Sequence, residues 1–335
     1  MTSRERVINT LCRKAVDRVP YSFDMTSRIA GRMVKRYGVA PDEFSRFMGD
    51  DLLFADCSAP GVRLDNGRYM DEFKVEWDVS DESHEIGDFG SIAAYPLPEP
   101  DLAGYAFPDG RDPVRFMDFD AQAMKSQGRF VILGMTGLFD FCWHLRGFEN
   151  FMMDMASGDA FAGALMDKGL EFNLDVVAGI PDGMDGVRIG EDWGLQKGLI
   201  TGAPLWRKYL KPRLKILYEA VRKRGLKLFI HTCGDIAELF PDIIELGVEV
   251  VNPVQPEAMD IRFLQREYGK DIVMYGGLGS QSTLVFGTPA DVVAEARDRL
   301  ALFAGGGYIL GPAGAIPTDA PDDNVAALVD FAMGL

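Results

Sequence analysis

The stretch Lys227-Leu228-Phe229-Ile230-His231-Thr232-Cys233-Gly234 opens as an apolar run typical of a buried strand and closes on a histidine and a cysteine. Side chains alternate along a strand, so His231 and Cys233 are expected to face one point. Imidazole and thiolate together suit Zn²⁺. The alternative is a buried, hydrogen-bonded histidine beside an inert core cysteine. The rest of the chain has to decide between the two.

Short apolar or β-branched runs alternate with stretches of helical periodicity along most of the chain. Eight such runs are predicted as strands: Val19–Asp24, Leu52–Asp56, Phe130–Gly134, Val187–Glu191, Leu228–His231, Val248–Asn252, Ile272–Tyr275 and Tyr308–Gly311. Helices are predicted between them, including 151–178 and 205–224, the second split or kinked at Pro212. Eight strands alternating with helices predict an α/β fold, a (β/α)8 TIM barrel.

One section interrupts this alternation. Between residues 61 and 118, Asp65-Asn66-Gly67 separates two short alternating runs, which is a strong hairpin signal. Five prolines follow in loop-like surroundings. We therefore predict a hairpin-containing insertion after the second strand, near the barrel mouth, within a single domain that spans residues 1–335.

Polar residues gather where the predicted strands end. The ends carry Asp24, Asp56, Glu191, Asp192, His231, Cys233, Asn252 and Gln255. In a barrel of this kind the chemistry lies at the C-terminal ends of the strands, so these residues are expected to share a site. Capping explains some of the aspartates and asparagines but not the whole set.

The composition excludes several kinds of partner. A net charge of −16 without clustered basic residues argues against nucleic acid and against an anionic membrane surface. The four cysteines lack the spacing of a disulfide scaffold, and no apolar run approaches the roughly 18 residues of a membrane span. The N-terminal residues read as an amphipathic helix rather than a signal peptide, so a cytoplasmic setting is expected. The sequence leaves a homodimer open.

The second half resembles the uroporphyrinogen decarboxylase superfamily. The resemblance rests on Gly190-Glu191-Asp192-Trp193-Gly194, His231-Thr232-Cys233-Gly234-Asp235, Asn252-Pro253-Val254-Gln255-Pro256, Gly276-Gly277-Leu278 and Ala320-Pro321-Asp322-Asp323-Asn324. It implies the same barrel as the strand pattern. The superfamily contains cofactor-free porphyrinogen decarboxylases and zinc-dependent methyltransferases that work with corrinoid proteins.

The decarboxylase branch fits less well. The resemblance places its strand-two aspartate at Asp56, but the paired arginines that bind substrate carboxylates in that branch have no clear match here. Arg28 and Arg32 read better as solvated helix residues, and Asp24 would repel an anionic substrate.

The methyltransferase branch matches at His231 and Cys233, which the resemblance implies as zinc ligands. A later cysteine completes that set in the branch, and Gly314 stands in its place here. Either zinc is retained with Glu191 or Asp192 replacing the missing ligand, or the site binds an organic ligand without metal. We favour the set His231, Cys233 and Glu191 with an open fourth position, as in catalytic zinc sites.

The leading hypothesis is a zinc-dependent methyltransferase acting on a small methylated compound, such as an aryl methyl ether, with a corrinoid protein. Asp235 or Asp192 would fix the imidazole, and the aromatic residues near the strand ends would contact a ring. We expect catalytic roles for Asp56, Asp192 and Gln255, and substrate contacts from Asp24, Asn252, Trp193 and Phe139. His84 and His144 are weaker candidates than His231. A metal-free decarboxylase of a small organic acid and a non-catalytic binding protein are the alternatives.

Overall fold

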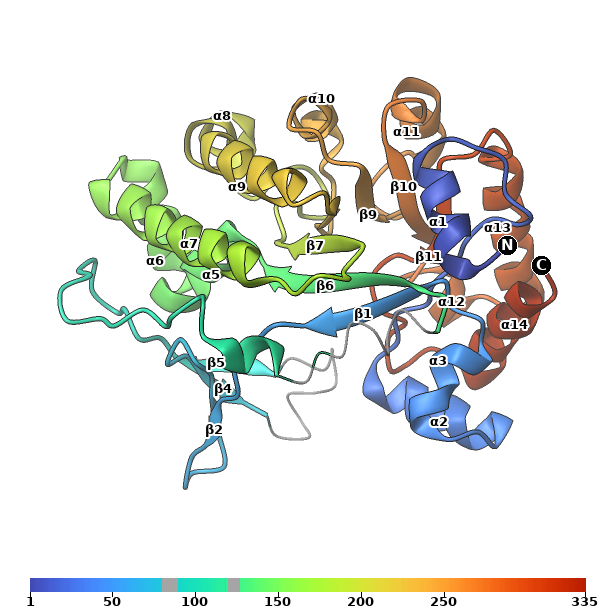
Figure 1. The fold of residues 1–335 in the computed structure, drawn as a ribbon, viewed down its shortest axis with the longest axis horizontal. Helices are drawn as coiled ribbons and strands as arrows, with labels where there is room; N and C mark the ends of the chain where they lie inside the picture. The colour runs from blue at the N-terminus through green and yellow to red at the C-terminus, as the bar shows by residue number, and fades with distance from the viewer. Residues whose placement is uncertain (80–89, 118, 120–126) are drawn as a thin grey trace.

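The computed structural model describes residues 1–79, 90–117, 119 and 127–335. Within them, seven parallel strands form one curled sheet in the order β1-β6-β7-β8-β9-β10-β11 (Figure 1). The strands are β1 (Leu52–Asp56), β6 (Phe130–Thr136), β7 (Gly186–Gly190), β8 (Lys227–His231), β9 (Val250–Val254), β10 (Val273–Leu278) and β11 (Tyr308–Pro312). The architecture is mixed α/β and barrel-like, as the sequence predicts.

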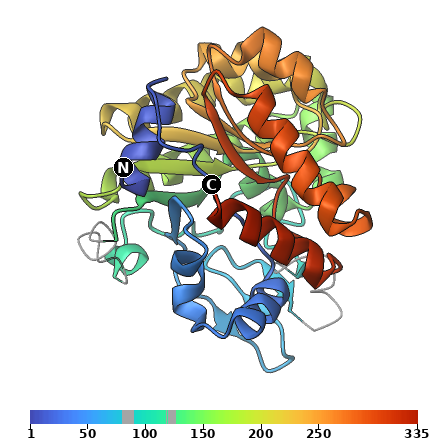
Figure 2. The ribbon, with the colours of Figure 1, turned by 90° about the vertical axis from the view of Figure 1, so that its right-hand side faces the viewer.

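Helices connect the strands, and most of them cover the outside of the sheet (Figures 1 and 2). They are α1 (Ser3–Leu11), α2 (Ser27–Tyr37), α3 (Phe44–Phe47), α5 (Leu138–Arg146), α6 (Phe148–Ser157), α7 (Ala160–Gly179), α8 (Gly202–Tyr209), α9 (Lys211–Lys223), α10 (Phe240–Glu245), α11 (Ile261–Tyr268), α12 (Thr283–Phe286), α13 (Pro289–Leu302) and α14 (Asp322–Met333). Short 3-10 turns are η1 (Pro41–Glu43), η3 (Pro113–Phe116) and η4 (Ala237–Leu239). The helix predicted over 151–178 is two helices, because the chain turns at Gly158 with φ +77°. Pro212 lies in the first turn of α9, where the predicted helix over 205–224 divides.

The predicted first strand, Val19–Asp24, is wrong as a strand. Toward β11 the segment makes isolated bridges, Tyr21 with Leu310 and Met25 with Ile316. Toward β1 the Tyr21 oxygen accepts a hydrogen bond from Asp51 N (2.9 Å). The amides of Tyr21 and Phe23 donate to the carboxylates of Asp51 (2.9 Å) and Asp50 (3.2 Å) instead of to backbone carbonyls, so no regular ladder forms there.

The inner face of the sheet changes from apolar to polar along the strands. An inner cluster contains Val7 of α1 with Leu52, Phe130, Ile132, Phe229, Val250, Val273, Tyr275 and Ile309. Because side chains on one face recur every second residue, Phe229 is followed inward by His231, and Val250 by Asn252. An apolar lower layer thus supports a polar layer at the C-terminal ends of the strands.

A small antiparallel sheet lies beyond β1, in the order β2-β3-β4-β5. Its strands are β2 (Val62–Arg63), β3 (Tyr69–Met70), β4 (Glu76–Asp78) and β5 (Ser91–Ala94). β2 pairs with β3 across residues 64–68, which contain Asn66-Gly67. Residues 80–89, with His84, and residue 118 of the predicted insertion lie outside the described residues.

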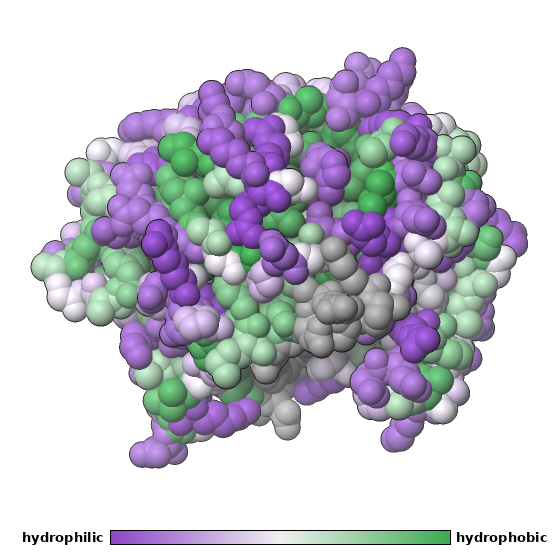
Figure 3. Space-filling model, viewed as in Figure 1, coloured by the Kyte–Doolittle hydropathy of each residue, from purple (hydrophilic) through white to green (hydrophobic). Residues whose placement is uncertain are grey.

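The two chain ends lie on the same side of the molecule (Figures 1 and 2). Hydrophilic side chains cover much of the face in Figure 3, with smaller apolar areas between them, as the net charge of −16 leads one to expect. No helix in the described ranges has the length and apolar character that crossing a membrane requires.

Candidate functional site

Three potential metal ligands converge where β7 and β8 end. The ligand atoms of Asp192, His231 and Cys233 all lie within 4.8 Å of one another, and each residue is half-buried. Sγ of Cys233 lies 3.6 Å from Nε2 of His231. Thr232 between them points the other way, and its hydroxyl accepts a hydrogen bond from Trp193 N (3.0 Å). The alternation along the end of β8 thus brings histidine and cysteine to one side.

Asn252, on the neighbouring strand β9, fixes the imidazole. Its Oδ1 lies 2.6 Å from Nδ1 of His231, and its Nδ2 donates to the Tyr275 carbonyl (3.5 Å). With Nδ2 occupied in that way, Oδ1 is the atom that faces the ring, so Nδ1 carries the proton and donates it. Nε2 is left with a lone pair directed toward Cys233, the arrangement that metal-binding histidines require.

Two glycines let the loops after β7 and β8 meet closely. A Cβ on Gly194 would lie 2.6 Å from the Cys233 carbonyl oxygen, and one on Gly234 would lie 2.4 Å from the Gly194 carbonyl carbon. Gly234 also has φ +82°, which side chains disfavour. Its amide donates to Oε1 of Gln255 (3.1 Å), so this buried side chain holds the Cys233 loop in place.

The electrostatic surroundings disfavour a free thiolate. Burial, together with the negative charge of Asp192, raises the pKa of Cys233 above its ordinary value. Burial, with the positive charge of Arg188, lowers the pKa of His231. Asp192 Oδ1 accepts a hydrogen bond from Cys233 N (2.8 Å), which ties the carboxylate to the same loop. Neutral imidazole and a carboxylate are ready ligands, and a bound divalent cation would stabilise the thiolate.

Glu191, expected as the third ligand, points elsewhere in the structure. Its Oε2 accepts a hydrogen bond from the Phe139 amide (2.7 Å) in the first turn of α5. Gly137, the N-cap residue of this helix, has no side chain that could accept a hydrogen bond from the first-turn amides, and the carboxylate of Glu191 accepts one instead. Burial raises the pKa of Glu191 to about 7. Among the described residues, the group that converges contains Asp192 in its place.

Arg188 and Asp140 belong to the surroundings of the site and were not anticipated. Arg188, in the middle of β7, donates to Asp24 (2.9 Å), and its guanidinium lies 4.0 Å from the ring centroid of Phe54. Asp140 of α5 accepts hydrogen bonds from Asp192 N (3.2 and 3.3 Å). Arg188 could have been recognised from the sequence as a candidate site residue, because it is a charged residue inside an otherwise apolar strand.

Trp193 and Phe139, predicted as substrate contacts, and Asp56, predicted as catalytic, make other contacts in the structure. Trp193 is buried against Trp206, with ring centroids 5.1 Å apart, and Phe139 is buried near Phe151. Both rings belong to the hydrophobic core. Asp56 is exposed at the end of β1, where its Oδ1 accepts hydrogen bonds from Ser58.

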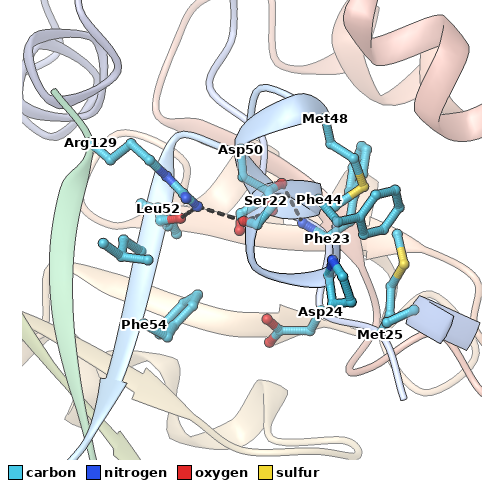
Figure 4. Close-up of a pocket in the computed structure, with 14 residues that line it drawn as sticks. Ser22, Phe23, Asp24, Met25, Phe44, Met48, Asp50, Leu52, Phe54 and Arg129 are labelled. Atoms are coloured by element: carbon cyan, nitrogen blue, oxygen red, sulfur yellow. Dashed lines mark hydrogen bonds between the residues drawn. The ribbon is translucent and has the colours of Figure 1, made fainter. Parts of the chain in front are cut away.

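A cavity of about 340 Å³ opens at the seam between residues 22–25 and β1 (Figure 4). Asp24 and Phe54 face it, as do the sulfur-containing side chains of Met25 and Met48. On its far wall Arg129 donates to Oγ of Ser45 (2.7 Å), which donates to the buried Asp50 (2.7 Å).

Burial raises the pKa of Asp50 to about 7. Asp24, which also lines this cavity, pairs with Arg188 of β7.

Comparisons with known proteins agree with this architecture. A methyltransferase structure from Methanosarcina mazei superposes with a TM-score of 0.76 at 19% identity, covering 99% of this chain and 98% of that one, which shows the fold. Methylcobamide:CoM methyltransferase MtbA from Methanosarcina acetivorans is 23% identical over 69% of this chain, and its counterpart from Methanosarcina mazei is 26% identical over 60%. The matches span 66% and 57% of those relatives' lengths. The family model described as uroporphyrinogen decarboxylase (URO-D) matches residues 124–334, more than half of the chain, and the protein therefore belongs to that family.

Proposed function

We propose that this protein is a zinc-dependent methyltransferase that moves a methyl group between a small methylated compound, such as an aryl methyl ether, and a corrinoid protein. The observation that carries the proposal is the convergence of Asp192, His231 and Cys233, with Nε2 of His231 directed toward Cys233. Two relatives named methylcobamide:CoM methyltransferase support the reaction class. A reducing compartment such as the cytoplasm would keep Cys233 available as a ligand.

The donor set fits zinc. One nitrogen, one sulfur and one carboxylate oxygen leave a fourth tetrahedral position for substrate. Position 314, where methyltransferases of this superfamily carry a cysteine, is a glycine with φ +89° and no atom within 4 Å of a Cβ built there. Asp192 therefore replaces that ligand in our proposal. Zinc bound here would supply a Lewis acid that polarises the ether oxygen and stabilises the negative charge left on it.

The chain's own residues would orient the reaction. In the demethylating direction, the carbon–oxygen bond of the ether would break with its electron pair left on the oxygen, and the corrinoid partner would be the acceptor of the methyl group. Asn252 holds the histidine in the correct tautomer, and Gln255 holds the loop that presents Cys233. In the opposite direction a thiol would accept the methyl group at the same position.

A metal-free decarboxylase receives less support. A decarboxylase of a small organic acid that resembled the decarboxylase branch would hold a substrate carboxylate with arginines near the first strand. Arg32 instead donates to Asp322 (2.6 Å) and to the carbonyls of Thr318 and Ala320 (3.0 and 2.9 Å). Its guanidinium joins α2 to the segment before α14, which is a structural task.

Zinc content and methyl transfer together test the proposal. Protein purified without chelators should hold stoichiometric zinc by mass spectrometry, the His231→Ala variant should lose it, and the matched His144→Ala variant should keep it. Methyl transfer to candidate corrinoid proteins, followed by the cobalt absorption spectrum, should require the zinc. Metal-free protein that releases CO₂ from a small acid would refute the proposal.

A further inference from the structure

A second cavity, of about 450 Å³, lies between the small sheet and α5. Its lining includes Asp56 at the end of β1 and the rings of Tyr69, Phe73, Trp77 and Phe141. Its link to the converging ligands runs through the strand order of the large sheet, in which β6 and β7 are neighbours. Thr136, which also lines it, pairs in register with Gly190 two residues before Asp192.

The aromatic walls of this cavity are held in place by contacts of their own. Phe73 meets Phe141 edge to face, with centroids 5.1 Å apart and planes at 88°, and meets Phe172 similarly at 5.0 Å. Trp77 Nε1 donates to Asp71 (2.8 Å), which also accepts from the Phe73 amide (2.9 Å). Fixed aromatic surfaces of this kind form a ready site for a flat apolar ligand.

His144 contributes an imidazole to the wall of this cavity. Its ring stands edge-on to Trp77 and Trp143, with centroids 5.2 and 4.1 Å away. Within the described part of the chain no hydrogen bond reaches it. Burial lowers its pKa to about 4, so it offers one N–H donor and one nitrogen acceptor at neutral pH. His144 is half-buried, so its ring nitrogens remain available to the hydroxyl or ether oxygen of a ligand in the cavity.

The charges near the cavity are largely engaged. Asp71 accepts from Trp77 and from two backbone amides, and Glu72 pairs with Arg115 and accepts from the Ala59 amide (3.0 Å). Asp56 remains, exposed at the rim. Among the described lining residues no cation is present that would attract an anion.

We propose that this cavity binds an uncharged aromatic ring that carries a hydroxyl or ether oxygen, with neutral His144 as the hydrogen-bond partner of that oxygen. The ring's use as a methyl donor rests on the proposed function, whereas binding does not. Phe141 lines the cavity, and the preceding residue of α5, Asp140, accepts a hydrogen bond from Asp192 N.

Calorimetric titration of the full chain with 2-methoxyphenol tests the proposal. We expect one binding site, weakened about tenfold in His144→Leu, as the loss of one hydrogen bond implies, and largely restored in His144→Gln. Benzoate, an anion, and benzyltrimethylammonium, a cation, are of similar size to 2-methoxyphenol, and both should bind more weakly than it does. Equal binding by wild type and His144→Leu, no binding of 2-methoxyphenol, or tighter binding of either ion would overturn the proposal.

Two further measurements keep the outcome interpretable. If His144→Leu does not fold, quenching of wild-type tryptophan fluorescence by 2-methoxyphenol, reduced in Trp77→Phe, tests the same cavity, and quenching that Trp77→Phe leaves unchanged contradicts it. Methyl transfer from 2-methoxyphenol by the wild type, measured beside its binding, separates the two proposals. Binding without methyl transfer then refutes the proposed function alone, and methyl transfer that is indifferent to His144 refutes the cavity alone.

Discussion

Replacing Asn252 by leucine tests whether the imidazole is held for metal binding. In the wild type its Oδ1 lies 2.6 Å from Nδ1 of His231 and the residue is 2% exposed, so water cannot readily replace it. Leucine has similar volume but no acceptor. The ring then loses the bond that keeps the proton on Nδ1, and part of the population places it on Nε2, the atom that binds metal.

The expected loss is about 10–100-fold in zinc affinity, which corresponds to about 1.4–2.7 kcal/mol. Competition with a chromophoric zinc chelator at neutral pH measures it. Asn252→Asp keeps an acceptor at the same position and should retain zinc affinity.

Asn324 provides a matched control. It is also buried, at 1% exposure, and donates to the carbonyls of Leu284 (3.0 Å) and Gly287 (2.8 Å), with no contact to the metal ligands. Asn324→Leu should lower the melting temperature but leave zinc affinity unchanged. Wild-type zinc affinity in Asn252→Leu, or an equal loss in Asn324→Leu, would show that the reasoning is wrong.

Three further predictions follow from the same geometry. Gly234→Ala should weaken zinc binding, because its Cβ would overlap the Gly194 backbone. Gly225→Ala should not, because Gly225 has a similar φ of +73° but no atom lies within 4 Å of a Cβ built there. Equal effects of the two variants in a chelator titration contradict this prediction. Asp192→Asn should lower zinc affinity more than tenfold and Glu191→Gln should change it little, and the reverse order by the same titration would restore Glu191 as the ligand. Burial lowers the pKa of His144 in the folded protein to about 4, from an ordinary 6.5. The free energy of unfolding should therefore fall as the pH drops from about 6.5 to 4, and it should fall less in His144→Phe. An equal dependence of that free energy on pH in the two proteins counts against a buried neutral imidazole.

The strands of the second half were predictable because each is a short apolar run whose neighbours are helical. The approach of His231 to Cys233 followed from alternation along one strand. The third ligand did not, because Glu191 and Asp192 are consecutive and point in different directions. Which of the two faces His231 and Cys233 depends on the contact of Glu191 with the uncapped start of the helix after Gly137, and that contact joins segments over fifty residues apart.

The prediction of a first strand over residues 19–24 was wrong for a related reason. Residues 19–24 have the composition of a strand, but Asp50 and Asp51 supply hydrogen-bond acceptors that a sequence pattern cannot place. Trp193 and Phe139 looked like entry-loop residues because they adjoin strand ends. Only the packing of Trp206 and Phe151 against them reveals that they are internal.

The seam beside β1 makes one wall of the sheet different from the others. Elsewhere neighbouring strands are joined by repeated amide-to-carbonyl bonds, whereas Tyr21 and Phe23 are fastened there by aspartate side chains. Transient separation of that edge requires the release of fewer main-chain bonds than separation of β8 from β9. Deuterium should consequently enter the amides of residues 21–23 sooner than those of the central strands. Transient opening of the sheet would then occur beside the smaller cavity.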